Sequence, residues 1–89
     1  MSNPLGAIER ELEGERASAL GEAGRKLEAA LAELALGETE DRLDEAAMAA
    51  WHYIILRESV RMFDHKAALE VYRVPGKVRA RIGVMKKPG

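Results

Sequence analysis

The sequence contains no cysteine, which excludes disulfide bonds and thiolate metal sites. Aromatic residues make up only 4% of its 89 residues, and there are three prolines. A chain of this length forms one domain and buries only about 60–65% of the surface that its unfolded form exposes. With no covalent cross-link and few large side chains for a core, oligomerisation is the remaining common source of stability.

Long hydrophobic runs are also missing. The longest nearly uncharged run is AAMAAWHYIIL, residues 46–56, which has 11 residues. A membrane-spanning helix needs about 20. The first 15 residues are acidic and lack the apolar core of a secretory signal. The sequence therefore predicts no membrane span and a cytoplasmic location.

What the sequence has in quantity is alanine, leucine, glutamate and arginine, the composition of an all-α protein. Apolar residues recur at the helical period from Pro4 to Leu36, which predicts one long amphipathic helix over residues 4–36. Gly37 should end it in the left-handed conformation that glycine favours after a helix. A second, central helix is expected over residues 39–63, with Thr39 as its cap.

The run 46–56 lies inside this central helix. A helix that is apolar all round is normally buried all round, so we expect this one at the centre of the fold. Asp64 can cap a third helix, and Pro75 can open a fourth that ends at Gly83. The prediction is a small domain of three to four helices, with two short helices over 64–83 and a mobile basic tail over 84–89.

Charge is divided unevenly between the two halves. Residues 1–45 carry 12 acids and 5 bases, net −7, and residues 46–89 carry 3 acids and 9 bases, net +6. This asymmetry indicates either a basic binding surface or two halves that attract each other. The candidate nucleic-acid contacts are Lys77, Arg79, Arg81, Lys86 and Lys87.

Residues 63–83 could form a degenerate helix-turn-helix that carries these cations to a DNA groove. The comparison fails at three positions: Leu69 replaces the small residue at the helix contact, Arg73 replaces the turn glycine, and Arg79 replaces a core residue. Pro75 and Gly76 stand where base-reading side chains are expected. Nucleic-acid binding is the alternative hypothesis, and the basic end could equally pair with acidic helices of its own chain or of a copy.

Self-association is the favoured hypothesis, most simply as a two-fold homodimer. A helix of 33 residues is about 50 Å long, whereas a compact chain of this size is only about 30 Å across. The helix over residues 4–36 must therefore break near Gly21 or Gly24, or extend into a neighbouring molecule. Gly14, Ala17, Gly21 and Gly24 also form a small-residue strip on one helix face, where another backbone could approach closely.

No pattern in the sequence indicates catalysis. His52 and His65 have no carboxylate at the i+3 or i+4 spacing of a helical metal site, so we expect no metal. The nucleophile elbow and the phosphate-binding glycine loop are both missing. Trp51, Tyr53 and Tyr72 could line a ligand pocket, and a small enzyme or ligand carrier would need one beside Trp51, His52 and Tyr53, but we expect these aromatic side chains to fill the core. We expect no catalytic residue, no cofactor and no small-molecule ligand.

Residues 49–83 contain a pattern that resembles a known protein family. Residues 49–83 contain a Trp-His-Tyr run, an Asp-His pair that opens a helix, a tyrosine before a Val-Pro turn, and a closing glycine: Trp51-His52-Tyr53, Asp64-His65, Tyr72, Val74-Pro75 and Gly83. This pattern resembles an uncharacterised family of small bacterial helical proteins. The resemblance implies a helical fold and brings no activity or functional residue with it.

Overall fold

The computed structural model describes the backbone of residues 4–86 and the side chains of residues 14 and 17–84. Over this range the protein is all-α, with four helices: α1 (Pro4–Leu36), α2 (Glu40–Ser59), α3 (His65–Val71) and α4 (Gly76–Lys86). The described residues include no strand. This confirms the predicted fold class.

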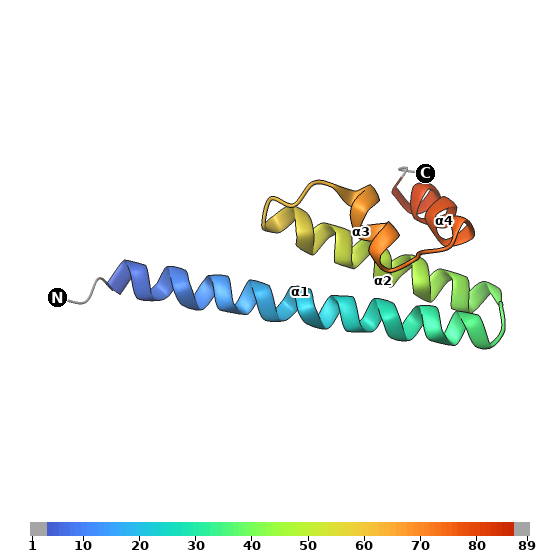
Figure 1. Ribbon diagram of the computed structural model, residues 1–89, viewed down its shortest axis with the longest axis horizontal. Coiled ribbons are helices and arrows are strands. Elements are labelled where there is room, and N and C mark those ends of the chain that lie inside the picture. Colours follow the sequence, from blue (N-terminus) through green and yellow to red (C-terminus); the bar gives the residue numbers. More distant parts are fainter. Residues whose placement is uncertain (1–3, 87–89) are drawn as a thin grey trace.

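α2 is the central element. It returns antiparallel along α1 (Figure 1), α3 and α4 both pack on it, and Tyr72 at the end of α3 reaches α1. α3 and α4 each pack on α2 and do not pack on each other. The two terminal helices therefore depend on α2 for their placement.

α1 is one continuous helix of 33 residues, with no break at Gly21 or Gly24. At 1.5 Å per residue it is about 50 Å long, whereas the 20 residues of α2 cover about 30 Å. The N-terminal part of α1 extends beyond the rest of the protein (Figure 1). The radius of gyration is accordingly 15.6 Å, against about 12 Å for a compact chain of this length.

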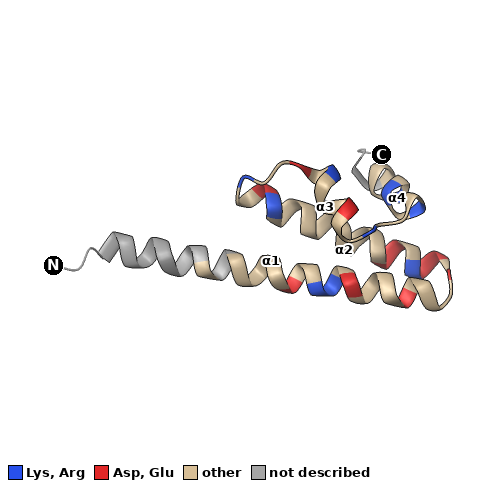
Figure 2. Cartoon of the chain, in the orientation of Figure 1, with Lys and Arg blue, Asp and Glu red and all other residues tan. Residues whose placement is uncertain are grey.

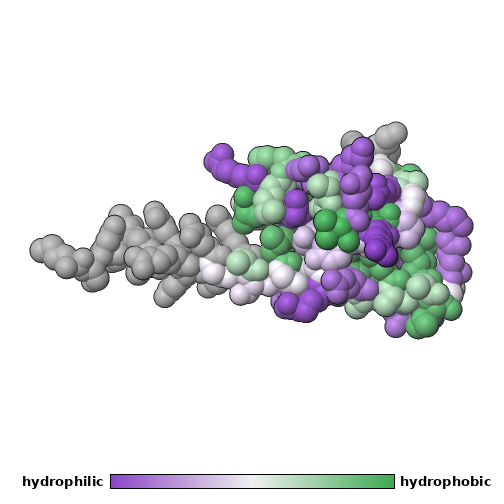
Figure 3. Space-filling view, viewed as in Figure 1, coloured by the Kyte–Doolittle hydropathy of each residue, from purple (hydrophilic) through white to green (hydrophobic). Residues whose placement is uncertain are grey.

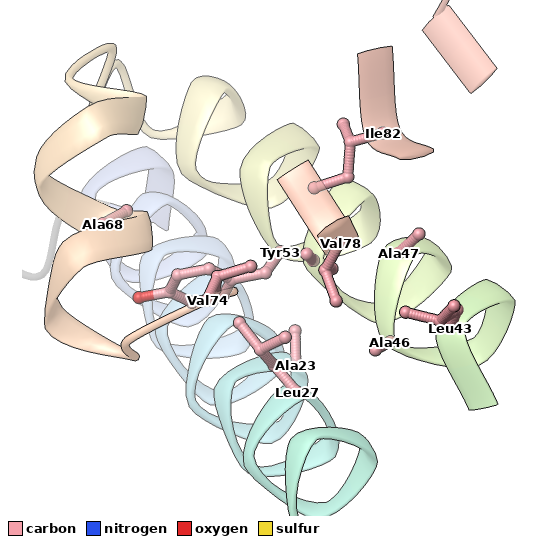
Figure 4. Packing of buried hydrophobic residues seen from close by; sticks show 11 residues of the cluster. Ala23, Leu27, Leu43, Ala46, Ala47, Tyr53, Ala68, Val74, Val78 and Ile82 are labelled. Atoms are coloured by element: carbon pink, nitrogen blue, oxygen red, sulfur yellow. The ribbon is translucent and has the colours of Figure 1, made fainter. Parts of the chain in front are cut away.

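The core lies where α1, α2 and the segment of α3 to α4 meet (Figure 4). Leu27, Ile54 and Val78 are the largest fully buried side chains, one each from α1, α2 and α4. Alanines fill much of the α1–α2 contact, and Tyr53 closes the core toward α3. Burial of apolar area stabilises the fold by roughly 25 cal/mol per Å², so a core of such small side chains yields only modest stability.

Two predicted helix caps are confirmed. The Thr39 side chain accepts a hydrogen bond from the Arg42 amide at 3.1 Å, and the Asp64 carboxylate accepts one from the Ala67 amide at 3.0 Å. Each cap satisfies an amide of the first turn that has no partner within the helix. Asn3, the residue before α1, lies outside the described residues.

The predicted helix ends need correction. No glycine among the described residues has a positive φ, so Gly37 does not end α1 in the left-handed conformation. Its carbonyl instead accepts a hydrogen bond of 2.7 Å from the Arg42 guanidinium. α2 ends at Ser59 rather than 63, and α4 continues through Gly83 to Lys86, because an exposed glycine costs a helix only about 1 kcal/mol. Residues 84–86 thus belong to α4, and residues 87–89 lie outside the described residues.

Left-handed residues do end two helices, and both are arginines. Arg61 has φ 63° and Arg73 has φ 54°. After α2 the Arg61 and Met62 amides donate to the carbonyls of Glu58 and Arg57, and the same pattern closes α3. These are Schellman motifs, in which glycine is the usual left-handed residue.

The expectation that residues 46–56 are buried on all sides is wrong. Ala46, Ala47, Ala50, Tyr53 and Ile54 are buried, but Met48 is 60% exposed and Ile55 43% exposed. His52, in the same run, is also exposed. α1, α3 and α4 cover part of the α2 circumference, and a stripe of apolar side chains remains outside.

Candidate functional site

The basic end of the chain lies against the acidic start of α2 (Figure 2). Lys77 pairs with Glu38 at 3.0 Å. Arg81 pairs with Glu40 at 2.7 Å and with Asp44 at 2.6 Å. Hydrogen bonds from Arg81 to Asp44 and then Glu40 raise the pKa of its guanidinium above the usual value. The attraction predicted between the two halves thus operates within one chain.

The other predicted nucleic-acid contacts do not complete a free cationic face. Arg79 is partly buried, and its Nε donates to the Val74 carbonyl at 3.0 Å. The side chains of Lys86 and Lys87 lie outside the described residues. Since Lys77 and Arg81 have carboxylate partners and Arg79 donates to a backbone carbonyl, the described side chains of this surface do not form the cluster of unpaired cations that phosphate binding requires.

The comparison with a helix-turn-helix succeeds at one position and fails at another. Arg73 adopts the left-handed conformation expected of the turn glycine that it replaces. The two helices nonetheless make no direct packing contact, with Leu69 at the position where a small residue is needed. The arrangement supports two separate short helices that close the core against α2.

The predicted small-residue strip divides into two parts. Gly14, Ala17 and Gly21 are exposed, whereas Gly24 is buried. A Cβ atom added at Gly24 would overlap the Tyr72 hydroxyl and lie 3.3 Å from its Cζ atom. The close approach permitted at Gly24 is therefore used by α1 and the end of α3 within one chain.

Tyr72 also packs on a second tyrosine. Its ring lies edge-on to Tyr53, with centroids 5.1 Å apart and planes at 79°, a favourable geometry for an aromatic pair. Burial, followed by the interaction with Tyr53, raises the pKa of the Tyr72 hydroxyl above 10.0. These contacts agree with a role for both tyrosines in packing.

The histidines lie in different surroundings. His65 Nε2 is 2.8 Å from the Glu58 carboxylate, a polar contact across the α2–α3 junction that the spacing did not predict. His52 is exposed on α2. Within the described part of the chain, no group of three or more histidine, aspartate or glutamate side chains could hold a metal ion. No helix in the same part is long and apolar enough to cross a membrane.

The feature that the sequence reasoning missed is a groove between α1 and α2. Its volume is about 520 Å³, and α3 and α4 contribute no residue to its lining, which consists of Ala23, Lys26, Met48, Ala49, Trp51, His52 and Ile55. Met48, Trp51 and Ile55 stand at i, i+3 and i+7, the spacing of one helix face. This spacing could have identified the groove, but the surrounding alanines made the whole run look equally buried.

Other exposed apolar side chains are scattered. They come from several elements, namely Leu36, Met62, Phe63, Val71 and Val84. On the face drawn in Figure 3, hydrophobic side chains emerge in separate places between hydrophilic ones. Single exposed apolar residues are common on protein surfaces, so the continuous groove is the stronger candidate for a binding surface.

Comparison with known proteins identifies a family of unknown function. A family model described as a family of unknown function (DUF6665) matches residues 2–89. This agrees with the resemblance of residues 49–83 to an uncharacterised family and extends it to almost the whole chain. No curated protein and no solved structure matches.

Proposed function

Because this chain is a member of DUF6665, a family of unknown function, we propose from its geometry alone that it is a non-catalytic helical interaction module that associates with a second copy of itself. One observation carries the proposal: α1, α3 and α4 cover only part of the circumference of the apolar run of α2 and leave a stripe of it exposed. A helix that is apolar all round is stable in water when its whole circumference is buried. The exposed side chains of Met48 and Ile55, which flank the partly buried Trp51 on this stripe, call for a further covering surface.

The length of α1 supports the same proposal. About 20 Å of this helix extends past the end of α2, and this part of the sequence carries Leu5, Ile8 and Leu12 at spacings of three and four. A helical segment of about 13 residues is marginal in water without tertiary contacts. A second copy would supply such contacts and would bury the apolar positions of both chains.

The ion pairs indicate what kind of association to expect. Lys77 and Arg81 are paired with acids of their own chain, so these two cations do not need the acids of a partner. Apolar association is less sensitive to salt than association through exposed ion pairs. We therefore expect a dimer that persists at high ionic strength, and we retain the cytoplasmic location as a prediction.

Molar mass by light scattering after size exclusion tests the proposal. At tens of micromolar the mass should be twice the 9.8 kDa of one chain, in both low and high salt. A mass of one chain across the accessible concentration range would refute it. A dimer that dissociates in salt would show that charge pairing between copies, rather than apolar contact, holds it together.

A further inference from the structure

We infer that the groove between α1 and α2 binds the N-terminal half of α1 from a second copy, in a two-fold dimer whose α1 helices run antiparallel. The inference rests on the proposed self-association and names its interface. The groove has walls from both helices and contains Trp51, the only tryptophan of the sequence.

The apolar positions of α1 lead directly to this groove. At 100° per residue, Leu5, Ile8, Leu12 and Ala19 share one face of the helix, and Ala23 continues the same face. Ala23 is also a wall of the groove. One face of α1 thus carries the large apolar residues of its N-terminal half and, further along, the groove that could receive them from a partner.

Antiparallel pairing matches two large apolar positions of α1 with two alanines. With a two-fold axis between Glu15 and Arg16, the position of Ile8 lies opposite Ala23 of the other copy. The same register places Leu12 opposite Ala19 and Leu5 opposite Lys26. Alternation of large and small residues across an interface lets two helices approach closely and interdigitate.

The axis itself is electrostatically favourable. In this register Glu15 of each copy lies opposite Arg16 of the other, which gives two symmetry-related pairs of opposite charge. Because an isologous contact repeats every interaction, one favourable pairing counts two times. The register requires no like charges at its centre.

The dimensions also agree. The part of α1 before Ala17 is about 20 Å long, and the α2 wall from Met48 to Ile55 is about 10 Å long. One N-terminal half is therefore long enough to cover the groove of the other copy. The exposed strip of Gly14, Ala17 and Gly21 lies on the opposite side of α1 and stays outside this interface.

The first test uses matched charge substitutions. Ile55→Glu and Met48→Glu should each convert the dimer to a monomer at concentrations where the wild-type chain is dimeric, and Ile8→Glu should do the same from the partner side. Val71→Glu, at a position 77% exposed on α3, and Ala17→Glu, on the opposite face of α1, should leave the mass unchanged. Helical circular dichroism establishes that each variant is folded.

The second test fixes the register by cross-linking. The sequence has no cysteine, so a chain carrying Leu5→Cys and Lys26→Cys contains only the two introduced thiols. These positions are about 32 Å apart along one helix and cannot join within a chain, because a disulfide needs Cα atoms within about 7 Å. Oxidation should give a covalent dimer, whereas Leu5→Cys with Ala32→Cys should not.

Trp51 supplies a third, independent readout. Its fluorescence should shift to longer wavelength on dilution through the dissociation range, because the groove becomes open to water.

The inference is overturned, and self-association stands, if the wild-type chain is a dimer, the Ile55→Glu variant has the same mass, and the Leu5→Cys, Lys26→Cys variant gives no covalent dimer. Loss of the dimer with Ala17→Glu alone would move the interface to the small-residue strip. A monomeric wild-type chain would remove both proposals.

Discussion

Two glycines on the same helix should respond differently to the same substitution. At Gly21 an added Cβ meets nothing closer than the Arg25 guanidinium at 3.6 Å. At Gly24 the same atom would overlap the Tyr72 hydroxyl and approach the Tyr53 ring to 3.6 Å. Each glycine-to-alanine change improves the helix by about 1 kcal/mol. Only the change at Gly24 adds the cost of overpacking, about 1–3 kcal/mol.

The expected free energies of unfolding follow from these two contributions. Gly21→Ala should raise the stability by about 1 kcal/mol. Gly24→Ala should leave it unchanged or lower it by up to about 2 kcal/mol. The difference between the two variants, about 1–3 kcal/mol, isolates the clash with Tyr72 because the helix contribution cancels.

Urea denaturation followed by circular dichroism measures the difference. All variants should be compared at one protein concentration, since association adds to apparent stability. Combining Gly24→Ala with Tyr72→Phe removes the overlapping oxygen and should recover part of the loss. If Gly21→Ala and Gly24→Ala stabilise the protein equally, Tyr72 does not pack against Gly24 and the placement of the end of α3 on α1 is wrong.

Three further predictions concern the loops and the basic end. Arg61→Gly should raise the free energy of unfolding by about 1 kcal/mol in urea denaturation, because glycine adopts the left-handed conformation without the penalty of a side chain; a loss of stability would mean that the Arg61 side chain matters more than its backbone. The pKa of the Tyr72 hydroxyl is raised above 10.0 in the folded state, so its protonation stabilises the fold at lower pH, and this stabilisation is lost as the hydroxyl ionises at higher pH. Tyr72→Phe should therefore flatten the fall in melting temperature above pH 10.0; identical alkaline profiles for the two proteins would contradict this. Wild-type protein should not retard duplex DNA even at low salt, since Lys77 and Arg81 are paired within the chain; salt-dependent binding that Arg81→Glu abolishes would revive the nucleic-acid hypothesis.

Local features of the helices were accessible from the sequence because they depend on neighbours along the chain. Thr39 and Asp64 cap α2 and α3, as the residue types and spacings predicted. The all-α class and the extent of α1 from Pro4 to Leu36 follow from composition and period alone. Each of these features requires only the side chain and the backbone amides within about one turn of it.

Features that depend on contacts between helices were decided by the tertiary structure. Gly37 and Gly83 carry the same local signal for a helix end, yet one follows α1 without a left-handed φ and the other lies inside α4. Arg61 and Arg73 take the left-handed positions instead, because the chain must turn there for α3 and α4 to reach α2.

The sequence alone determined that the chain is helical, that its charge is divided between two halves, and that α1 is too long for a compact monomer of this size. Only the tertiary structure decided that the two charged halves meet within one chain, through Lys77 and Arg81. It also decided that Gly24 receives Tyr72 and that Met48 and Ile55 remain exposed. The physical reason is that hydrophobicity is a property of each residue, whereas burial depends on which surfaces the folded chain can bring against it.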